Sequence, residues 1–235
     1  MRLVRGSLAD TAADRDLTRE LVRVTETTGA PSIRVWTPPR QIAFGRRDTT
    51  ADGYQTARRI AAEHGYEPIE RSAGGRAVAH TGSTVAFAFV SPIESNRSGI
   101  ESRYNDAISR LTGALEAVGA TVGRGEPEAS FCAGAHSLRH EGKIAGLAQR
   151  VRAESALVGG YVIVRSTDET EVSTVLDPIY AALGAPFDPG SVGSVEGANG
   201  TADVDAVIDA IETAFADNDD PVVLTAEKLR VTEAP

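Results

Sequence analysis

The order in which strand-like and helix-like segments follow one another constrains the fold of this chain most. Apolar patterns of strand type cover residues 33–36, 41–45, 66–71, 84–90, 143–151, 156–164 and 222–231. Apolar residues at helical spacing cover 10–28, 54–64, 100–118, 167–183 and 201–216. Pairs of strands interleave with helices, unlike the regular strand–helix alternation of a doubly wound sheet. We therefore expect an α+β fold with a mixed, mainly antiparallel sheet and flanking helices.

Length and the lack of a linker indicate how this fold is divided. A chain of 235 residues can bury a substantial core, and it contains no internal repeat and no low-complexity segment. We expect a single domain over residues 1–235, in which residues 185–235 could form a small C-terminal appendage.

Two strand-like segments carry more specific expectations. Residues 33–36 and 41–45 are separated by a Pro-rich turn and are expected to pair as a hairpin. Along 84–90, Val85, Phe87 and Phe89 share one face of the strand and alanines occupy the other. The alanine face is expected to be covered as well, by a ligand.

Charge and composition exclude several functional classes. Acidic residues outnumber basic ones by 33 to 24, and the net charge of −9 would repel the phosphate backbone of a nucleic acid. No stretch has the roughly 18 apolar residues of a membrane span or the apolar core of a signal peptide. One cysteine allows no intramolecular disulfide and suits a reducing cytoplasm, where we expect the protein. The scarcity of lysine indicates adaptation to high salt, or alternatively a GC-rich coding bias.

The segment 128–150 contains the sole cysteine, Cys132, and one of only two lysines, Lys143, eleven positions later. A positive charge near a thiol favours the nucleophilic thiolate, so the pair suits acyl chemistry. The structural alternative is a buried Cys132 and a solvated Lys143.

The segment 71–80 is the second candidate site. Gly74 and Gly75 let the backbone approach a ligand closely, and Arg71 and Arg76 could hold a carboxylate or a phosphate. A tight turn with solvated arginines is the structural alternative. The G-x-G-x-x-G spacing of a dinucleotide-binding loop is absent.

Other motifs are excluded or left open. Ile144 follows Lys143 where a P-loop requires Ser or Thr, so a P-loop is excluded. His136 and His140 lack the further ligands of a metal site, and no metal is expected. His136 and His80 are equal candidates for a base that serves Cys132, and each is also compatible with a structural role.

Two motifs in order, Arg71-Ser-Ala-Gly-Gly-Arg-Ala-Val-Ala-His80 and Gly142-Lys-Ile-Ala-Gly-Leu-Ala-Gln-Arg150, resemble the biotin/lipoate protein ligase superfamily. They are most similar to its lipoate–protein ligase and octanoyl (lipoyl) transferase branch, over residues 32–193. The resemblance implies a core like that of class II aminoacyl-tRNA synthetases, with Lys143 at the acyl carbonyl or acyl-adenylate. It also implies that the acyl chain is enclosed by Arg71, Ser72, Gly74, Gly75, Arg76, Ala77, Val78, His80, Ile144, Ala145, Gly146 and Ala148.

The resemblance implies one of two chemistries. In the first, Cys132 forms a thioester and passes an octanoyl or lipoyl group to a lysine of a lipoyl domain, without a cofactor. The expected partners are the glycine-cleavage H protein and the lipoyl domains of 2-oxoacid dehydrogenases. In the second, an ATP- and Mg-dependent lipoate–protein ligase acts through lipoyl-AMP. A third possibility is an inactive relative that only binds lipoate or lipoyl domains.

This chain departs from the family pattern at several positions. Arg76 replaces the third glycine of the loop, Ala73 disturbs the first, and Lys143 stands alone where ligases often have two basic residues. A biotin ligase is disfavoured because the G-R-G-R loop of those enzymes is missing.

Overall fold

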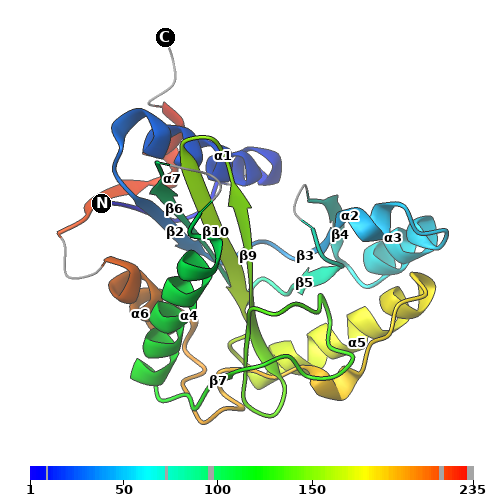
Figure 1. The fold of residues 1–235 in the computed structure, drawn as a ribbon. Coiled ribbons are helices and arrows are strands. Elements are labelled where there is room, and N and C mark those ends of the chain that lie inside the picture. Colours follow the sequence, from blue (N-terminus) through cyan, green and yellow to red (C-terminus); the bar gives the residue numbers. More distant parts are fainter. Residues whose placement is uncertain (9, 72–73, 95–97, 217–219, 232–235) are drawn as a thin grey trace.

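The structure is a computed structural model, and it describes residues 1–8, 10–71, 74–94, 98–216 and 220–231. The described residues form a large sheet with helices on both faces and a small sheet beside it (Figure 1). The large sheet has the order β11-β1-β2-β6-β10-β9-β8-β7. Its two pairings that involve β1 are parallel and the remaining ones are antiparallel. The prediction of an α+β fold with a mixed, mainly antiparallel sheet is therefore confirmed.

The strands are short except for the three that form the centre of the large sheet. The large sheet contains β1 (Arg2–Arg5), β2 (Ser32–Trp36), β6 (Val85–Pro92), β7 (Gly123–Arg124), β8 (Ser137–Arg139), β9 (Lys143–Val151), β10 (Ser155–Val162) and β11 (Val222–Thr225). The small sheet contains β3 (Gln41–Phe44), β4 (Glu67–Glu70) and β5 (Val78–His80), with β3 in the middle.

The helices cover both sheets. On the large sheet, α4 (Ile100–Ala117) and α6 (Val204–Ala216) pack together on one face, and α1 (Thr11–Thr28) and α7 (Ala226–Val231) lie on the other (Figure 1). The small sheet is accompanied by α2 (Arg46–Thr49), α3 (Tyr54–Glu63) and α5 (Ser166–Ala182), and a 3-10 turn, η1, covers Pro189–Ser191.

Local signals set the ends of α1, which covers the predicted helical range within one residue. The Asp10 side chain accepts a hydrogen bond of 2.7 Å from the N–H of Ala13, which caps the first turn. Gly29 ends the helix in the left-handed conformation with φ 65°, where glycine carries no Cβ penalty.

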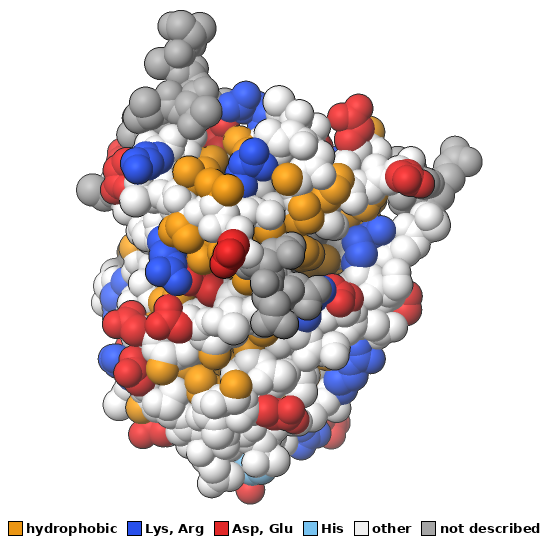
Figure 2. Space-filling model, turned by 90° about the vertical axis from the view of Figure 1, so that its left-hand side faces the viewer, with side chains coloured by type: hydrophobic (Ala, Val, Ile, Leu, Met, Phe, Trp, Pro, Cys, Tyr) orange, Lys and Arg blue, Asp and Glu red, His pale blue; other side chains and the backbone are white. Residues whose placement is uncertain are grey.

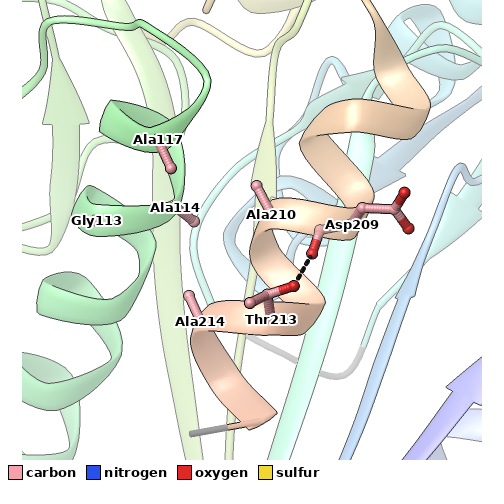
Figure 3. A pocket seen from close by; sticks show the side chains of 7 residues that line it. All are labelled: Gly113, Ala114, Ala117, Asp209, Ala210, Thr213 and Ala214. Carbon is pink, nitrogen blue, oxygen red and sulfur yellow. Dashed lines mark hydrogen bonds between the residues drawn. The ribbon is translucent and has the colours of Figure 1, made fainter. Parts of the chain in front are cut away.

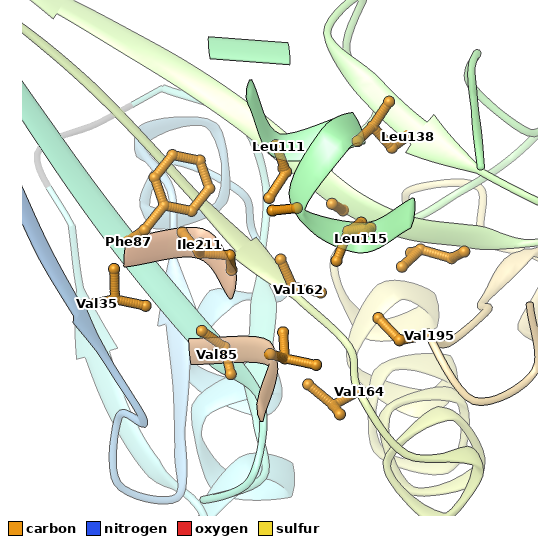
Figure 4. Packing of buried hydrophobic residues seen from close by; sticks show 14 of the residues in the cluster. Val35, Val85, Phe87, Leu111, Leu115, Leu138, Val162, Val164, Val195 and Ile211 are labelled. Carbon is orange, nitrogen blue, oxygen red and sulfur yellow. The ribbon is translucent and has the colours of Figure 1, made fainter. Parts of the chain in front are cut away.

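Three apolar clusters stabilise this arrangement. The first lies between the large sheet and the helices α4 and α6, and it includes Phe87, Leu111, Val162 and Ile211 (Figure 4). The second joins the small sheet, α3 and α5 to the end of β10. The third lies between the large sheet and α1. Because all three clusters reach β6 or β10, these two strands form the structural centre of the protein.

Helix α1 covers the alanine face of β6 at Ala88, which corrects the expectation of a ligand at this residue. Ala88 belongs to the same buried cluster as Leu17 and Leu21 of α1. The small side chain of alanine lets the helix approach the sheet closely, so protein side chains supply the cover.

Two other expectations about strands were wrong. Strand β2 pairs with β1 and β6 in the large sheet, whereas β3 pairs with β4 and β5 in the small one, so they form no hairpin. The strand predicted over 222–231 ends at Thr225, whose hydroxyl accepts a hydrogen bond of 3.3 Å from the N–H of Lys228. This contact caps α7, so the chain continues as a helix.

The residues after 185 contribute directly to the large sheet and its core. Helix α6 supplies Val207, Ile211 and Phe215 to the first cluster, and β11 pairs in parallel with β1.

Figure 2 shows the side of the molecule at the left of Figure 1, where apolar side chains lie in small groups among charges of both signs. Within the described ranges, none of the helices combines the length and the apolar character needed to cross a membrane.

Candidate functional site

Cys132 lies in the loop between β7 and β8 in an unusual backbone conformation. Its φ is 43°, in the left-handed region that non-glycine residues seldom adopt. Its N–H donates a hydrogen bond of 2.7 Å to the hydroxyl of Tyr180, which in turn donates one of 2.9 Å to the carbonyl of Ala77. Tyr180, on α5, therefore fixes the Cys132 loop against the segment that leads into β5.

Lys143, the first residue of β9, holds the same loop from the opposite side. The ammonium is almost fully buried, with 1% of the residue exposed. It donates hydrogen bonds to the carbonyl of Phe131 at 3.1 Å, the carbonyl of Cys132 at 3.0 Å and Oε1 of Glu126 at 2.8 Å. An ammonium has three N–H donors, so all three are occupied in this structure.

Arg71 is the cation that touches the thiol. Its Nη2 atom lies 3.2 Å from Sγ of Cys132 and 2.7 Å from the carbonyl oxygen of Arg76, and it donates to both. Arg71 follows β4, and its own N–H is bonded to the carbonyl of Phe44 at 2.9 Å. Reactive cysteines lie in electropositive, partly exposed surroundings, and the contact with Arg71 places Cys132 in such surroundings.

Two glycines, Gly75 and Gly45, allow the backbone around Gly75 to lie close to the thiol of Cys132. A Cβ on Gly75 would lie 2.6 Å from Sγ of Cys132 and 3.1 Å from Nη2 of Arg71, and the φ of Gly75 is 89°. A Cβ on Gly45 would lie 2.1 Å from the carbonyl oxygen of Gly75. Only glycine fits at both positions. The segment of residues 74–77, here called the Gly75 loop, therefore packs directly against the thiol.

Arg76 pairs with a buried carboxylate. Its Nη1 atom lies 3.3 Å from Oδ1 of Asp48, whose other oxygen accepts a hydrogen bond of 2.9 Å from the N–H of Gly45. Burial raises the pKa of Asp48, against the opposing effects of the Gly45 hydrogen bond and the charge of Arg76. Arg76 therefore anchors the loop in this structure.

The two histidines considered as a base have other partners. Nδ1 of His80 lies 3.3 Å from the Thr84 hydroxyl, and burial together with the charge of Arg71 lowers the pKa of His80 to about 4. The ring of His136 stacks on Tyr104 with centroids 3.5 Å apart. Among the described contacts, none joins either ring to Cys132.

Some of the other residues that the resemblance implied at the acyl chain are buried in the core, and others are partly or fully exposed. Ala77 and Val78 are buried in the second cluster, and Ile144 and Ala145 in the first. Gly146 lies beside the Lys143 side chain, whereas Ala148 and Gly74 are exposed. Ser72 lies outside the described residues.

Three residues of the site were not predicted from the sequence: Glu126, Tyr161 and Tyr180. Six buried side-chain polar atoms of the described residues have no hydrogen-bond partner, and three of them border this site. These three are Nε of Arg71, Oε2 of Glu126 and the hydroxyl of Tyr161. Native structures leave few such groups, so their clustering indicates a place where a ligand or water completes the hydrogen bonding. Of these three residues, only Tyr161 has a recognisable signal in the sequence, because its hydroxyl-bearing side chain directly follows Gly159-Gly160 in an otherwise apolar strand.

Two shallow hollows of the surface lie away from this site. One, of about 360 Å³, lies between α4 and α6 and is lined mainly by small side chains, including Ala114 and Ala210 (Figure 3). A neighbouring one, of about 660 Å³, includes Asn105 and Arg124.

Over the described part of the chain, no three His, Cys, Asp or Glu side chains are grouped so that they could hold a metal ion.

Comparison with known proteins places this chain in a family. The family model of the lipoyl protein ligase A/B catalytic domain matches residues 10–216, so the chain belongs to this family. The resemblance stated from the two motifs is therefore confirmed.

Curated relatives within this family are transferases. The chain is 29% identical over 119 residues to octanoyl-[GcvH]:protein N-octanoyltransferase of Geobacillus kaustophilus (strain HTA426), covering 50% of this chain and 42% of the relative. It is 32% identical over 145 residues to the protein of the same name from Kyrpidia tusciae (strain DSM 2912 / NBRC 15312 / T2), covering 59% and 50%. The matches thus span about half the length of these relatives.

The fold is that of solved lipoate ligases. A crystal structure of lipoate-protein ligase A bound with ATP matches with a TM-score of 0.75 and 19% identity, over 98% of this chain and 92% of the other. This likeness confirms the predicted catalytic-core fold.

Proposed function

We propose that this protein transfers an octanoyl or lipoyl group to the ε-amine of a lysine on a lipoyl-carrier domain, through a thioester on Cys132. The observation that carries the proposal is the contact of 3.2 Å between Nη2 of Arg71 and Sγ of Cys132. A thiol paired with a cation, in a loop held by Tyr180 and Lys143, is the arrangement of an activated nucleophile.

The reaction has two transfers. First, Sγ of Cys132 bonds to the acyl carbonyl carbon, the bond from that carbon to the donor breaks, and the leaving group takes up a proton. Second, the acceptor amine attacks the same carbon, the C–S bond breaks, and the amine loses a proton. In both steps the carbonyl oxygen becomes transiently negative, and the buried charge of Lys143 stabilises that charge electrostatically.

The names of the curated relatives support a choice of donor and acceptor. The curated relatives are named for moving octanoyl from GcvH to a protein nitrogen, and we propose the glycine-cleavage H protein as donor here. Lipoyl domains of 2-oxoacid dehydrogenases are the proposed acceptors. The acyl chain would lie over Gly146 and Ala148, which share a face of β9 and carry no bulky side chain. Each buried CH₂ group would favour binding by about 0.8 kcal/mol, which selects for chain length.

The free thiol and the engaged arginines favour the transferase over an ATP-dependent ligase. An adenylate would need Arg71 and Arg76 at its phosphate, whereas here Arg71 bonds to Cys132 and Arg76 to Asp48. A transferase needs no rearrangement of either side chain.

The test is octanoyl transfer from octanoylated GcvH to a lipoyl domain, with and without ATP, and with Cys132→Ser as the control. Transfer that needs no ATP and is lost in Cys132→Ser supports the proposal. Full activity of Cys132→Ser would contradict it. Lipoate-dependent ATP–pyrophosphate exchange would instead assign the ligase reaction, with Mg as its metal.

A further inference from the structure

Tyr161 carries a buried hydroxyl that this structure leaves without a partner. The residue is 8% exposed and stands in β10, at the end that meets the second cluster. Among the described residues, no group forms a hydrogen bond with its hydroxyl. Because an unsatisfied buried hydroxyl destabilises a fold, such a group indicates a role in binding.

The hydroxyl lies near the Lys143 side chain, beside Gly146. Tyr161 and Gly146 are opposite each other in the β10–β9 pairing. A Cβ on Gly146 would lie 3.1 Å from the Tyr161 hydroxyl oxygen and 3.2 Å from Cε of Lys143. A Cβ at these distances would crowd both groups, so glycine at position 146 lets the Tyr161 hydroxyl and the Lys143 side chain approach the same point of β9.

The ring of Tyr161 also connects to the nucleophile loop. It packs against the ring of Phe131, with centroids 5.4 Å apart, and Phe131 immediately precedes Cys132. The ring of Tyr161 is thus held by Phe131 and by strand β10, which is the kind of preorganisation that a transition-state donor needs.

Tyr180, the other buried tyrosine of the site, differs from Tyr161 because its hydroxyl is hydrogen-bonded within the protein. Its oxygen accepts from the N–H of Cys132 and donates to the carbonyl of Ala77. Its hydrogen-bonding capacity is used by the protein itself. The hydroxyl of Tyr161 has the same chemistry and remains available.

We propose that the hydroxyl of Tyr161 donates a hydrogen bond to the acyl carbonyl oxygen while Cys132 attacks, as the oxyanion donor of the acyl transfer. This inference rests on the proposed function and adds a residue to it. Lys143 cannot supply this bond without giving one up, because its three N–H groups are bonded to Glu126, Phe131 and Cys132.

The protonation state of Tyr161 suits this role. Burial, followed by the negative charges of Cys132 and Glu126, raises the pKa of Tyr161 well above the ordinary value of a phenol. The hydroxyl therefore keeps its proton throughout the neutral range, also when Cys132 is a thiolate.

The experiment compares the Tyr161→Phe and Tyr66→Phe variants of the full chain. Tyr66 is a matched control because it is also buried, and its hydroxyl is bonded to Glu171 at 2.6 Å. The first readout is the single-turnover rate at which p-nitrophenyl octanoate acylates Cys132. The others are the rate of alkylation of Cys132 by iodoacetamide and the melting temperature.

For Tyr161→Phe we expect acylation to slow about 100-fold, as on loss of one oxyanion donor. Its alkylation rate should stay unchanged, because iodoacetamide forms no oxyanion, and its melting temperature should be equal or higher. Tyr66→Phe should melt at a lower temperature and acylate at the wild-type rate. Equal acylation rates for wild type and Tyr161→Phe, or acylation and alkylation that fall in parallel, would overturn the inference. A wild-type protein that acquires no acyl group on Cys132 would instead overturn the proposed function.

Discussion

Nη2 of Arg71 lies 3.2 Å from Sγ of Cys132, although the two residues are 61 positions apart in the chain. The same nitrogen is bonded to the carbonyl of Arg76, so one guanidinium joins the nucleophile to the Gly75 loop. The reactivity of the thiol and the position of the loop are therefore coupled through Arg71.

Replacing Arg71 with methionine should slow alkylation of Cys132. The Arg71→Met side chain keeps much of the length and removes the guanidinium that contacts Sγ, so the iodoacetamide rate at pH 7 should fall about tenfold. Arg59→Met is the control, because Arg59 forms an exposed pair with Glu63 on α3. An unchanged rate in Arg71→Met would mean that Arg71 has no influence on the thiol.

Adding a methyl group at Gly75 should displace the thiol. The new Cβ of Gly75→Ala would lie 2.6 Å from Sγ at a φ of 89°, so both the thiol and the loop must move. We expect single-turnover acylation to fall about 100-fold, as is typical for a displaced reacting group. Gly113→Ala on α4 meets no atom within 4 Å and should acylate at the wild-type rate. Wild-type acylation by Gly75→Ala would show that the contact is not needed.

Lys143 should matter for stability as well as activity. Lys143→Met removes three hydrogen bonds and leaves the Glu126 carboxylate bonded to the Ser130 hydroxyl but without a cation, so we expect a loss of about 3 kcal/mol in the free energy of unfolding. Adding Glu126→Gln should recover about 1 kcal/mol of this loss, because the unpaired charge is then absent. Urea unfolding of the single and double variants measures both values. Equal stability of Lys143→Met and wild type would show that the lysine does not hold the loop.

His80 should make the protein less stable in acid. Its pKa of about 4 in the folded state lies below the ordinary value of 6.5, so the unfolded state takes up a proton first as the pH falls. The stability due to neutral His80 is complete above pH 6.5 and is lost progressively towards pH 4. By pH 5 the loss should be about 2 kcal/mol.

The measurement for His80 is urea unfolding at pH 7 and pH 5. His80→Gln should lose about 2 kcal/mol less than wild type between these pH values, since its side chain takes up no proton. His140→Gln, at an exposed position, should behave like wild type. The same pH dependence in His80→Gln and wild type would contradict this account.

The sequence predicted those parts of the fold that local signals determine. Helix α1 begins after Asp10 and ends at Gly29 because both caps are local. The separation of β2 and β3 into different sheets could not be predicted in the same way, since each strand pairs with segments far away in the chain. The short strand β1 was missed because its four residues acquire a role only beside β2 and β11. The cap at Thr225 was a local signal that the strand-like residues before it obscured.

The candidate site was predicted in part. The proximity of Cys132 and Lys143 followed from the sequence, and the structure brings them together. Their relationship differs from the one expected, because Lys143 bonds to the main-chain carbonyl of Cys132 while Arg71 touches the thiol. Which cation reaches Sγ depends on a contact between the Gly75 loop and the Cys132 loop, and such a contact between distant segments leaves no local pattern.

The central claim is that Cys132 carries the acyl group, and the intact mass of the protein tests it most directly. After incubation with octanoylated GcvH without an acceptor, the chain should gain the mass of one octanoyl group. Hydroxylamine should release that group, and Cys132→Ser should not acquire it. An unmodified wild-type chain, or an equal adduct on Cys132→Ser, would contradict the account.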